Sequence, residues 1–305
     1  MNKQTFLTLL ATFALLFSFT FSCHAKGKDK AKHVVFIGLD GWGAYSLPKA
    51  DMPNVKKLME DGAYTLKKRS ALPSSSAINW ASMFMGAGPE LHGYTEWGSK
   101  TPELPSRVLN KNGIFPTVFQ LLRDARPEAE IGCLYEWEGI KYVVDTLSLN
   151  YHYHVADCNK TPKELGNMAS AYIKEKHPAL VAICYDGPDH TGHTEGHDTP
   201  AYYEKLKELD IYVGQIVQAV KDAGILDDTI FILTSDHGGI DKGHGGKTMQ
   251  EMETAFIISG KNIKKGLRFD DVSMMQYDVA STIASIFNLE QPQVWIGRPM
   301  KMVFK

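Results

Sequence analysis

The stretch TIFILTSDHGGIDKGHGG, residues 229–246, joins an apolar run to two glycine-rich turns. The run over 229–233 is β-branched or bulky throughout and has no helical spacing, which predicts a buried strand. Asp236 and His237 follow at its end, and His244 lies seven residues beyond His237. The glycines allow positive φ and a close approach of the backbone to a ligand. Since carboxylate oxygen and imidazole nitrogen are ligands that zinc favours, the stretch predicts either a cation site or a plain polar turn.

Two other apolar runs predict buried strands that end in polar residues. The run over 33–39 ends at Asp40, and the run over 180–185 leads to Asp189 and His193. In open α/β sheets, ligands bind beyond the carboxyl ends of the strands, so Asp40 is placed to bind a ligand. Alternatively, Asp40 serves only as the cap of a helix. Asp189 and His193 are four residues apart and would lie on the same side of one helical turn.

Other polar residues lie near these strand ends. A catalytic zinc site uses few protein ligands and keeps one position open. We therefore expect Asp186, His190 and His197 to support the ligands or to lie in a loop. His152 and His154 are two residues apart, and this spacing is more typical of a strand or loop than of a metal site.

A cluster of serines precedes an amphipathic run in PSSSAINWASMFMG, residues 73–86. The pattern predicts a helix with the serines at its N-terminus, where orphan N–H groups and the helix dipole favour an anion. A serine at such a position is often only an N-cap. It becomes a nucleophile if its pKa is lowered, which a metal ion would do.

Strands and helices alternate along most of the chain, which predicts an α/β fold. We expect a three-layer α/β/α sandwich around a mostly parallel central sheet. The remaining predicted strands are 63–72, 131–135 and, as the last one, 253–259. The predicted helices besides 76–86 are 52–62, 116–123, 161–176, 200–223 and 276–287. A turn over 88–94 and an irregular loop over 97–113 complete the expected organisation.

The composition excludes some classes of protein. The chain has 305 residues, 44% of them hydrophobic, and a formal net charge of −2, so it can form a large core in one or two domains. No long basic run follows the N-terminus, which argues against nucleic acid as the main partner. Cys133 and Cys184 lie in apolar runs and are expected to be buried thiols, Cys158 lies in a polar loop, and no disulfide framework is expected.

The first 25 residues are predicted to be a targeting segment. Lys3 precedes an apolar run over 6–21, which has the length of a signal-peptide core and is short for a membrane span. Cleavage after Ala25 would release a soluble protein, whereas a lipid-modified Cys23 would make a lipoprotein and provide the only membrane attachment that we expect. Residues 26–32 then form a tether, and 33–305 a single domain of an exported, periplasmic or envelope-anchored protein.

Taken in order, these motifs resemble the alkaline phosphatase superfamily and, within it, the type I phosphodiesterase/nucleotide pyrophosphatase family. The resemblance runs from Asp40 to the GRP at 297–299, and its specific motifs are DxxGH at 189–193 followed by DHG at 236–238 and GHG at 243–245. It implies an alkaline phosphatase-like catalytic domain with two divalent metal ions, zinc in the family, lying close together. The implied ligands of one ion are Asp40, Asp236 and His237, and those of the other are Asp189, His193 and His244.

The resemblance also selects Ser76 as the nucleophile and as a contact of the metal, because it follows Pro73 by three residues and precedes Ala77. The family's phosphodiesterases usually carry threonine there. They also place an asparagine that binds a phosphate oxygen near the position of Trp97, so the choice between diester and monoester substrates stays open. Lys141 or a nearby backbone N–H could bind that oxygen instead.

The resemblance implies a metal-dependent hydrolase of small phosphate esters that forms a phosphoserine. A phosphomonoesterase, a phosphotransferase or a sulfatase of the same fold are alternatives. A sulfatase would need proline two residues and arginine four residues after the modified residue, where this chain has Ile78 and Trp80. An envelope protein that binds a metal or a glycan without catalysis is the alternative of another class.

Overall fold

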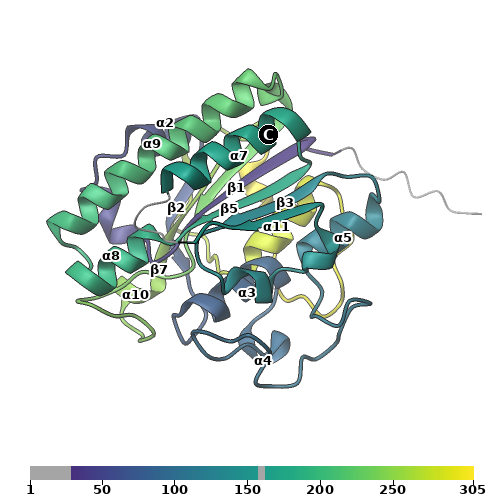
Figure 1. Ribbon diagram of the computed structural model, residues 1–305, viewed down its shortest axis with the longest axis horizontal. Helices are drawn as coiled ribbons and strands as arrows, with labels where there is room; N and C mark the ends of the chain where they lie inside the picture. Colours follow the sequence, from purple (N-terminus) through teal and green to yellow (C-terminus); the bar gives the residue numbers. More distant parts are fainter. Residues whose placement is uncertain (1–28, 157–161) are drawn as a thin grey trace, which may run out of the picture.

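The computed structural model describes residues 29–156 and 162–305. In this part of the chain eight strands form one sheet in the order β4-β3-β5-β1-β6-β7-β2-β8 (Figure 1). All of them run parallel except β7, which is antiparallel to both β6 and β2. The strands are β1 His33–Leu39, β2 Gly62–Arg69, β3 Ile131–Tyr135, β4 Tyr151–His154, β5 Leu180–Tyr185, β6 Thr229–Thr234, β7 Glu253–Gly260 and β8 Leu267–Arg268. The predicted mostly parallel sheet is confirmed.

Helices cover both faces of the sheet, which explains why the central strands are apolar on both sides. Strands β5 and β6 are buried at every residue. Along β1, Val34 and Phe36 pack into one hydrophobic cluster, and Val35 and Ile37 pack into the other. A strand with side chains that alternate between two cores cannot show the polar alternation of a half-exposed strand. The expected three-layer α/β/α sandwich is therefore observed.

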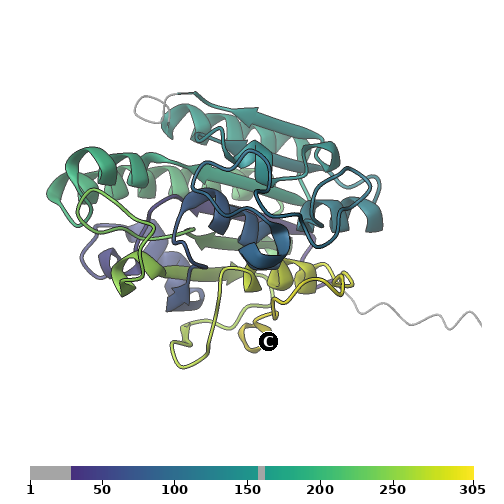
Figure 2. The ribbon, with the colours of Figure 1, turned by 90° about the horizontal axis from the view of Figure 1, so that it is seen from below.

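The helices divide between the two faces (Figures 1 and 2). One face carries α2 Pro53–Glu60, α7 Pro162–Lys176, α8 Gly187–Glu195 and the long α9 Pro200–Asp222. The other carries α3 Ser76–Met85, α5 Val118–Ala125 and α11 Asp278–Ile286, and Figure 2 shows α3 in blue and α11 in yellow on this side. Short helices are α4 Pro89–His92, α6 Ile140–Val143 and α10 Met249–Met252, and 3-10 turns are Ala44–Ser46, Thr146–Ser148, Leu226–Asp228 and Lys301–Val303.

Some expectations about individual elements were wrong. The strand expected to be the last is β7, and β8 follows it as a two-residue edge strand beside β2. An element of two residues leaves no periodic pattern to read. The expected turn over 88–94 contains the single-turn helix α4. His152 and His154 lie in the edge strand β4, one of the two settings that we expected for them.

The N-terminal predictions fall outside the described residues. This holds for the targeting segment with Cys23, for residues 26–28 of the tether, and for Cys158. Cys133 and Cys184 are buried and free, as expected. Within the described ranges, no helix has both the length and the apolar character that a membrane crossing would need.

Candidate active site

The polar residues that follow the three central strands meet at one edge of the sheet. Strand β1 pairs with β5 on one side and with β6 on the other, so the carboxyl ends of all three lie next to one another. Asp40 follows β1, and Asp236 and His237 follow β6. His237 Nε2 lies 3.4 Å from Asp40 Oδ1 and 3.3 Å from Asp236 Oδ2. We call these three buried residues the strand-end group.

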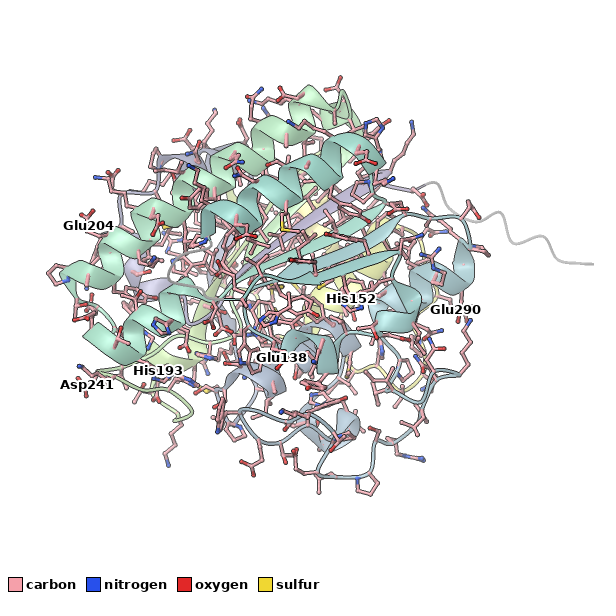
Figure 3. The ribbon with its side chains drawn as sticks, in the orientation of Figure 1. Glu138, His152, His193, Glu204, Asp241 and Glu290 are labelled. Atoms are coloured by element: carbon pink, nitrogen blue, oxygen red, sulfur yellow. The ribbon has the colours of Figure 1, made fainter. Side chains whose placement is uncertain are left out.

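A second group faces the first from a helix and a loop. Asp189 and His193 lie one turn apart on α8, and His193 Nε2 is 3.2 Å from Asp189 Oδ2. His244, from the glycine-rich loop after β6, brings its Nε2 to 3.8 Å from Asp189 Oδ1. Figure 3 labels His193 close to Asp241 of this loop. We call Asp189, His193 and His244 the helix-and-loop group.

Ser76 lies between the two groups. It is the first residue of α3, and Ser75 occupies the N-cap position. The Oγ of Ser76 is 3.1 Å from His237 Nε2 and 3.5 Å from Asp40 Oδ1. The structure therefore brings together all seven residues that the sequence predicted, and the predicted helix start is confirmed.

Each histidine of the two groups directs one ring nitrogen toward the site and the other toward the backbone. The Nδ1 atoms lie 2.7 Å from the Gly238 carbonyl for His237, 2.9 Å from the Lys242 carbonyl for His193, and 3.1 Å from the Ser74 carbonyl for His244. A carbonyl can only accept, so these contacts place the N–H on Nδ1. In the neutral form of each ring, Nε2 then carries the lone pair that could bind a metal. This second hydrogen bond is typical of histidines that bind metals.

The electrostatics of the strand-end group are those of charges buried without compensation. Burial raises the pKa of Asp236 to about 7, and burial together with the nearby carboxylates of Asp236 and Asp189 raises the pKa of Asp40 well above its usual range. Burial lowers the pKa of His237, so its imidazole is neutral. Bringing a cation to this group would relieve the cost of ionising two buried carboxyls.

The helix-and-loop group behaves differently because it contains an ion pair. Burial of Asp189 would raise its pKa, but the hydrogen bond from His193 and the nearby imidazoles lower it below its usual range. The same hydrogen bond raises the pKa of His193 to about 9. Burial lowers the pKa of His244 to about 4, which leaves its Nε2 available as a ligand.

The residues present fit divalent cations. Among the described residues, the buried atoms Asp189 Oδ1 and Asp236 Oδ2 have no hydrogen-bond partner. Two sets of ligand atoms lie within 4.8 Å of one another, one from Asp189, His193 and His244 and one from Asp40, Asp189 and His237. The first set equals the expected one. The second contains Asp189 where Asp236 was expected, so Asp189 lies within reach of both positions.

Further side chains hold the site in place, and the sequence did not single them out. Trp80 Nε1 donates to Asp40 Oδ2 over 2.9 Å, and Gly41 N–H donates to Asp236 Oδ1 over 3.1 Å. The buried Lys68 donates to the Ser235 carbonyl over 2.7 Å. Trp80 follows Ser76 by one helical turn, which is a spacing that could have indicated its role. Lys68 lies between Lys67 and Arg69 in β2, and the sequence does not show which of these three basic residues is buried.

Trp97 and Lys141, which were considered above in connection with phosphate binding, lie at the surface. Trp97 is 66% exposed, yet its carbonyl accepts from the Ala77 N–H over 3.1 Å, which keeps Trp97 next to the start of α3. Lys141 forms an ion pair with Glu138 at 2.5 Å. An indole beside the nucleophile cannot replace an amide as a donor to phosphate in the same geometry.

Comparison with known protein families shows to which family the chain belongs. The family described as "Type I phosphodiesterase / nucleotide pyrophosphatase" matches residues 34–256. The chain belongs to this family. Membership of the type I phosphodiesterase/nucleotide pyrophosphatase family accounts for the order of strand-end motifs along the sequence, since the matched segment includes Asp40, Ser76 and all of the predicted ligands.

Relatives of this family member are distant. The mouse protein "Bis(5'-adenosyl)-triphosphatase enpp4" is 26% identical over 221 residues, which cover 69% of this chain and 48% of that protein. The Aspergillus oryzae protein "GPI ethanolamine phosphate transferase 2" is 32% identical over 126 residues, 37% of this chain and 15% of that protein. The chain thus spans at most about half the length of these relatives.

Solved structures support the alkaline phosphatase-like fold. Murine ectonucleotide pyrophosphatase/phosphodiesterase 5 superimposes with a TM-score of 0.70 at 14% identity, covering 90% of this chain and 100% of that one. BT1596, a 2-O GAG sulfatase, gives a TM-score of 0.71 at 14% identity, covering 90% of this chain and 74% of that one. At such identities the likeness concerns the fold alone, so it does not separate phosphatase from sulfatase chemistry.

Proposed function

We propose that the chain is a metal-dependent hydrolase of small phosphate esters that works through a phosphoserine on Ser76. The observation that carries this proposal is the position of the Ser76 hydroxyl between two groups of carboxylates and imidazoles, 3.1 Å from His237 Nε2. Family membership supports phosphate ester chemistry, and the absence of the proline and arginine that a sulfatase needs after its modified residue argues against that alternative.

Two divalent ions, which we propose to be zinc, would occupy the two groups. The strand-end group would hold one and the helix-and-loop group the other, with Ser76 beside the first. When bound, such ions lower the pKa of a serine hydroxyl and stabilise negative charge on the phosphoryl and leaving-group oxygens. The Nε2 atoms of the neutral imidazoles, together with Asp189 Oδ1 and Asp236 Oδ2, which have no hydrogen-bond partner among the described residues, are the atoms that suit this role.

The chain's own residues supply the remaining requirements of phosphoryl transfer. The Ser76 hydroxyl lies 3.5 Å from Asp40 Oδ1, a carboxylate oxygen whose second lone pair can accept the hydroxyl proton. The serine oxygen attacks phosphorus in line as the ester oxygen leaves with the bonding electrons and takes up a proton. Water then cleaves the phosphoserine and regenerates the hydroxyl. The N-terminus of α3, where Ser76 lies, adds the positive end of the helix dipole beside the phosphoryl oxygens.

Transfer to an alcohol instead of water is the second candidate function. It is favoured by the similarity to "GPI ethanolamine phosphate transferase 2", which has the highest identity of the relatives named above. The same phosphoserine would pass its phosphoryl group to a hydroxyl. The two functions share every step up to the phosphoserine and differ only in the acceptor.

A kinetic comparison tests this function. Zinc-loaded protein is assayed against an aryl phosphate monoester and a bis-aryl diester, with and without an added alcohol, and Ser76→Ala is the matched control. We expect hydrolysis of at least one ester and none above background with the control. Undiminished turnover in Ser76→Ala protein would refute the nucleophile, and alkyl phosphate formed at the expense of inorganic phosphate would favour the transferase.

A further inference from the structure

His197 is buried beside the candidate metal groups with both ring nitrogens unsatisfied. Its side chain is 0% exposed, and its backbone N–H donates to the Asp241 carbonyl over 2.6 Å. Within residues 29–156 and 162–305, neither Nδ1 nor Nε2 has a hydrogen-bond partner. A neutral imidazole always carries one N–H, and leaving it unpaired in the interior is unfavourable. The burial of this imidazole without a hydrogen bond therefore calls for a structural or functional explanation.

The surrounding backbone is shaped to admit this ring. A Cβ on Gly192 of α8, or on Gly239 of the turn after His237, would lie 2.3 Å from ring atoms of His197. Real Cβ atoms do not approach so closely, so only glycine at both positions lets the imidazole lie against both segments. The Tyr202 ring, 5.4 Å away between centroids, packs against it from α9. The ring is therefore wedged between the two elements that carry most of the candidate ligands.

The ring of His197 faces the carboxylate of Asp189 at short range. His197 Nε2 lies 3.9 Å from Asp189 Oδ1, and this oxygen is also without a hydrogen-bond partner in the described part of the chain. The separation is about 1 Å longer than a hydrogen bond. A small rotation of the carboxylate would close it and would satisfy a buried donor and a buried acceptor together.

We propose that His197 is a positioning residue, whose Nε2–H donates a hydrogen bond to Asp189 Oδ1 when Asp189 binds metal. This inference rests on the proposed metal site. A carboxylate oxygen has two lone pairs, so Asp189 Oδ1 can contact an ion and accept from His197 together. The hydrogen bond would fix the orientation of the residue that lies within reach of both ions, as outer hydrogen bonds do for metal-binding carboxylates.

Two observations favour this role over direct metal binding. Two sets of possible ligand atoms lie within 4.8 Å of one another among the described residues, and His197 belongs to neither of them. In addition, no backbone carbonyl of the described residues accepts from Nδ1 of His197, in contrast to the three proposed histidine ligands. The ring is thus oriented by packing, which suits a donor to a neighbouring side chain.

A pair of nearly isosteric variants of the full chain tests the proposal. Glutamine in His197→Gln retains an N–H donor near the position of Nε2, whereas methionine in His197→Met does not. Zinc affinity is measured by competition with a chromophoric chelator. We expect His197→Met to weaken zinc binding on the order of 10- to 100-fold and His197→Gln to recover most of that loss. His152→Met, on the edge strand β4 away from His193 in Figure 3, is the control and should leave the affinity unchanged.

The outcomes separate this inference from the function on which it rests. Wild-type protein that binds no zinc would contradict both. Wild-type protein that binds zinc, with His197→Met binding equally well, would overturn only the role of His197. Equal losses in both variants, with equally lowered unfolding midpoints, would indicate packing alone and would also overturn it.

A measurement on wild-type protein keeps the proposal testable if the methionine variant does not fold. Histidine labelled with nitrogen isotope reports by NMR which ring nitrogen carries the proton. In the zinc-loaded protein we expect the Nε2–H tautomer for His197, with an Nε2–H signal protected from exchange. The Nδ1–H tautomer, or metal coordination of either nitrogen, would contradict the proposed hydrogen bond.

Discussion

The strand-end group and the helix-and-loop group contain similar side chains in different surroundings. The strand-end group lies directly after β1 and β6, and the side chain of His237 is 0% exposed. The helix-and-loop group comes from α8 and from a glycine-rich loop, and the side chain of His193 is 45% exposed. The first group is fixed by the central sheet and by Trp80, whereas the second is fixed by an ion pair and by contacts of α8.

This difference teaches how one site can combine rigidity with access. Buried carboxyls that resist ionisation bind a cation because it relieves their desolvation, so the strand-end group is suited to hold an ion and to fix Ser76 beside it. The exposed side is where a substrate and a water molecule can enter. The account therefore predicts large effects for substitutions on the buried side and smaller effects toward the surface.

The largest effect is expected for Ser76→Ala, which leaves both groups intact. Removing the attacking oxygen should lower turnover of an aryl phosphate by roughly 10³-fold or more, because Ser76 Oγ is the hydroxyl that lies within 3.5 Å of both Asp40 and His237. Zinc content, measured by atomic absorption, should remain close to that of the wild type. Loss of both activity and zinc would mean that Ser76 acts mainly as a ligand.

Asp236→Asn should separate stability from metal binding in the strand-end group. Burial raises the pKa of Asp236 from 3.8 to about 7, so the folded state binds the proton more tightly than the unfolded state. Stability of metal-free protein is therefore lost as pH rises from about 3.8 to about 7. Above that range the asparagine variant should be more stable than wild type by about 1 to 4 kcal/mol in denaturant unfolding, while its zinc affinity falls.

An Asp236→Asn protein that is less stable than wild type when both are metal-free would contradict the view of this group as uncompensated charge. Ser170→Ala, a change of a buried polar residue on α7, provides a control for the general effect of such substitutions.

Much of this arrangement could be predicted from the sequence because it depends on local patterns. The apolar runs before Asp40 and Asp236 predicted central strands, and the serines before an amphipathic run predicted the start of α3. The spacing of Trp80 from Ser76 places its ring on the side of α3 that faces the site, but its partner Asp40 and the wedged ring of His197 could not be predicted, since both depend on how distant segments approach. The two-residue β8 and the reversed direction of β7 also depend on pairing across the sheet rather than on local sequence.

Trp97→Asn probes the surface side of Ser76 and should have an intermediate effect. An amide at this position could donate to a phosphate oxygen from close to the backbone, whereas the single N–H of the indole lies farther out on a larger ring. We expect the ratio of diester to monoester turnover, measured as kcat/KM for matched aryl esters, to rise about tenfold. An unchanged ratio would mean that the substrate preference is set elsewhere, for example by the loop over 97–113 or by residues 142–156.

The smallest effect is expected for the ion pair of the helix-and-loop group. The hydrogen bond with Asp189 raises the pKa of His193 from 6.5 to about 9, so its contribution to stability is complete below pH 6.5 and is lost as pH rises to about 9. Because the side chain of His193 is 45% exposed and solvent screens the pair, we expect less than about 1 kcal/mol. Thermal unfolding of chelator-treated protein should show this decline, and His193→Gln should flatten it. If the stability of His193→Gln protein declines with pH as steeply as that of the wild type, the ion pair does not cause the decline.

The most direct test of the central claim is to trap the phosphoenzyme. Zinc-loaded protein is mixed with an aryl phosphate and quenched in acid, and the site of phosphorylation is found by peptide mass spectrometry. The account predicts one phosphoryl group on Ser76, and none on any residue of Ser76→Ala protein. Steady turnover without a phosphorylated peptide at any quench time, or a phosphoryl group on a different residue, would contradict it.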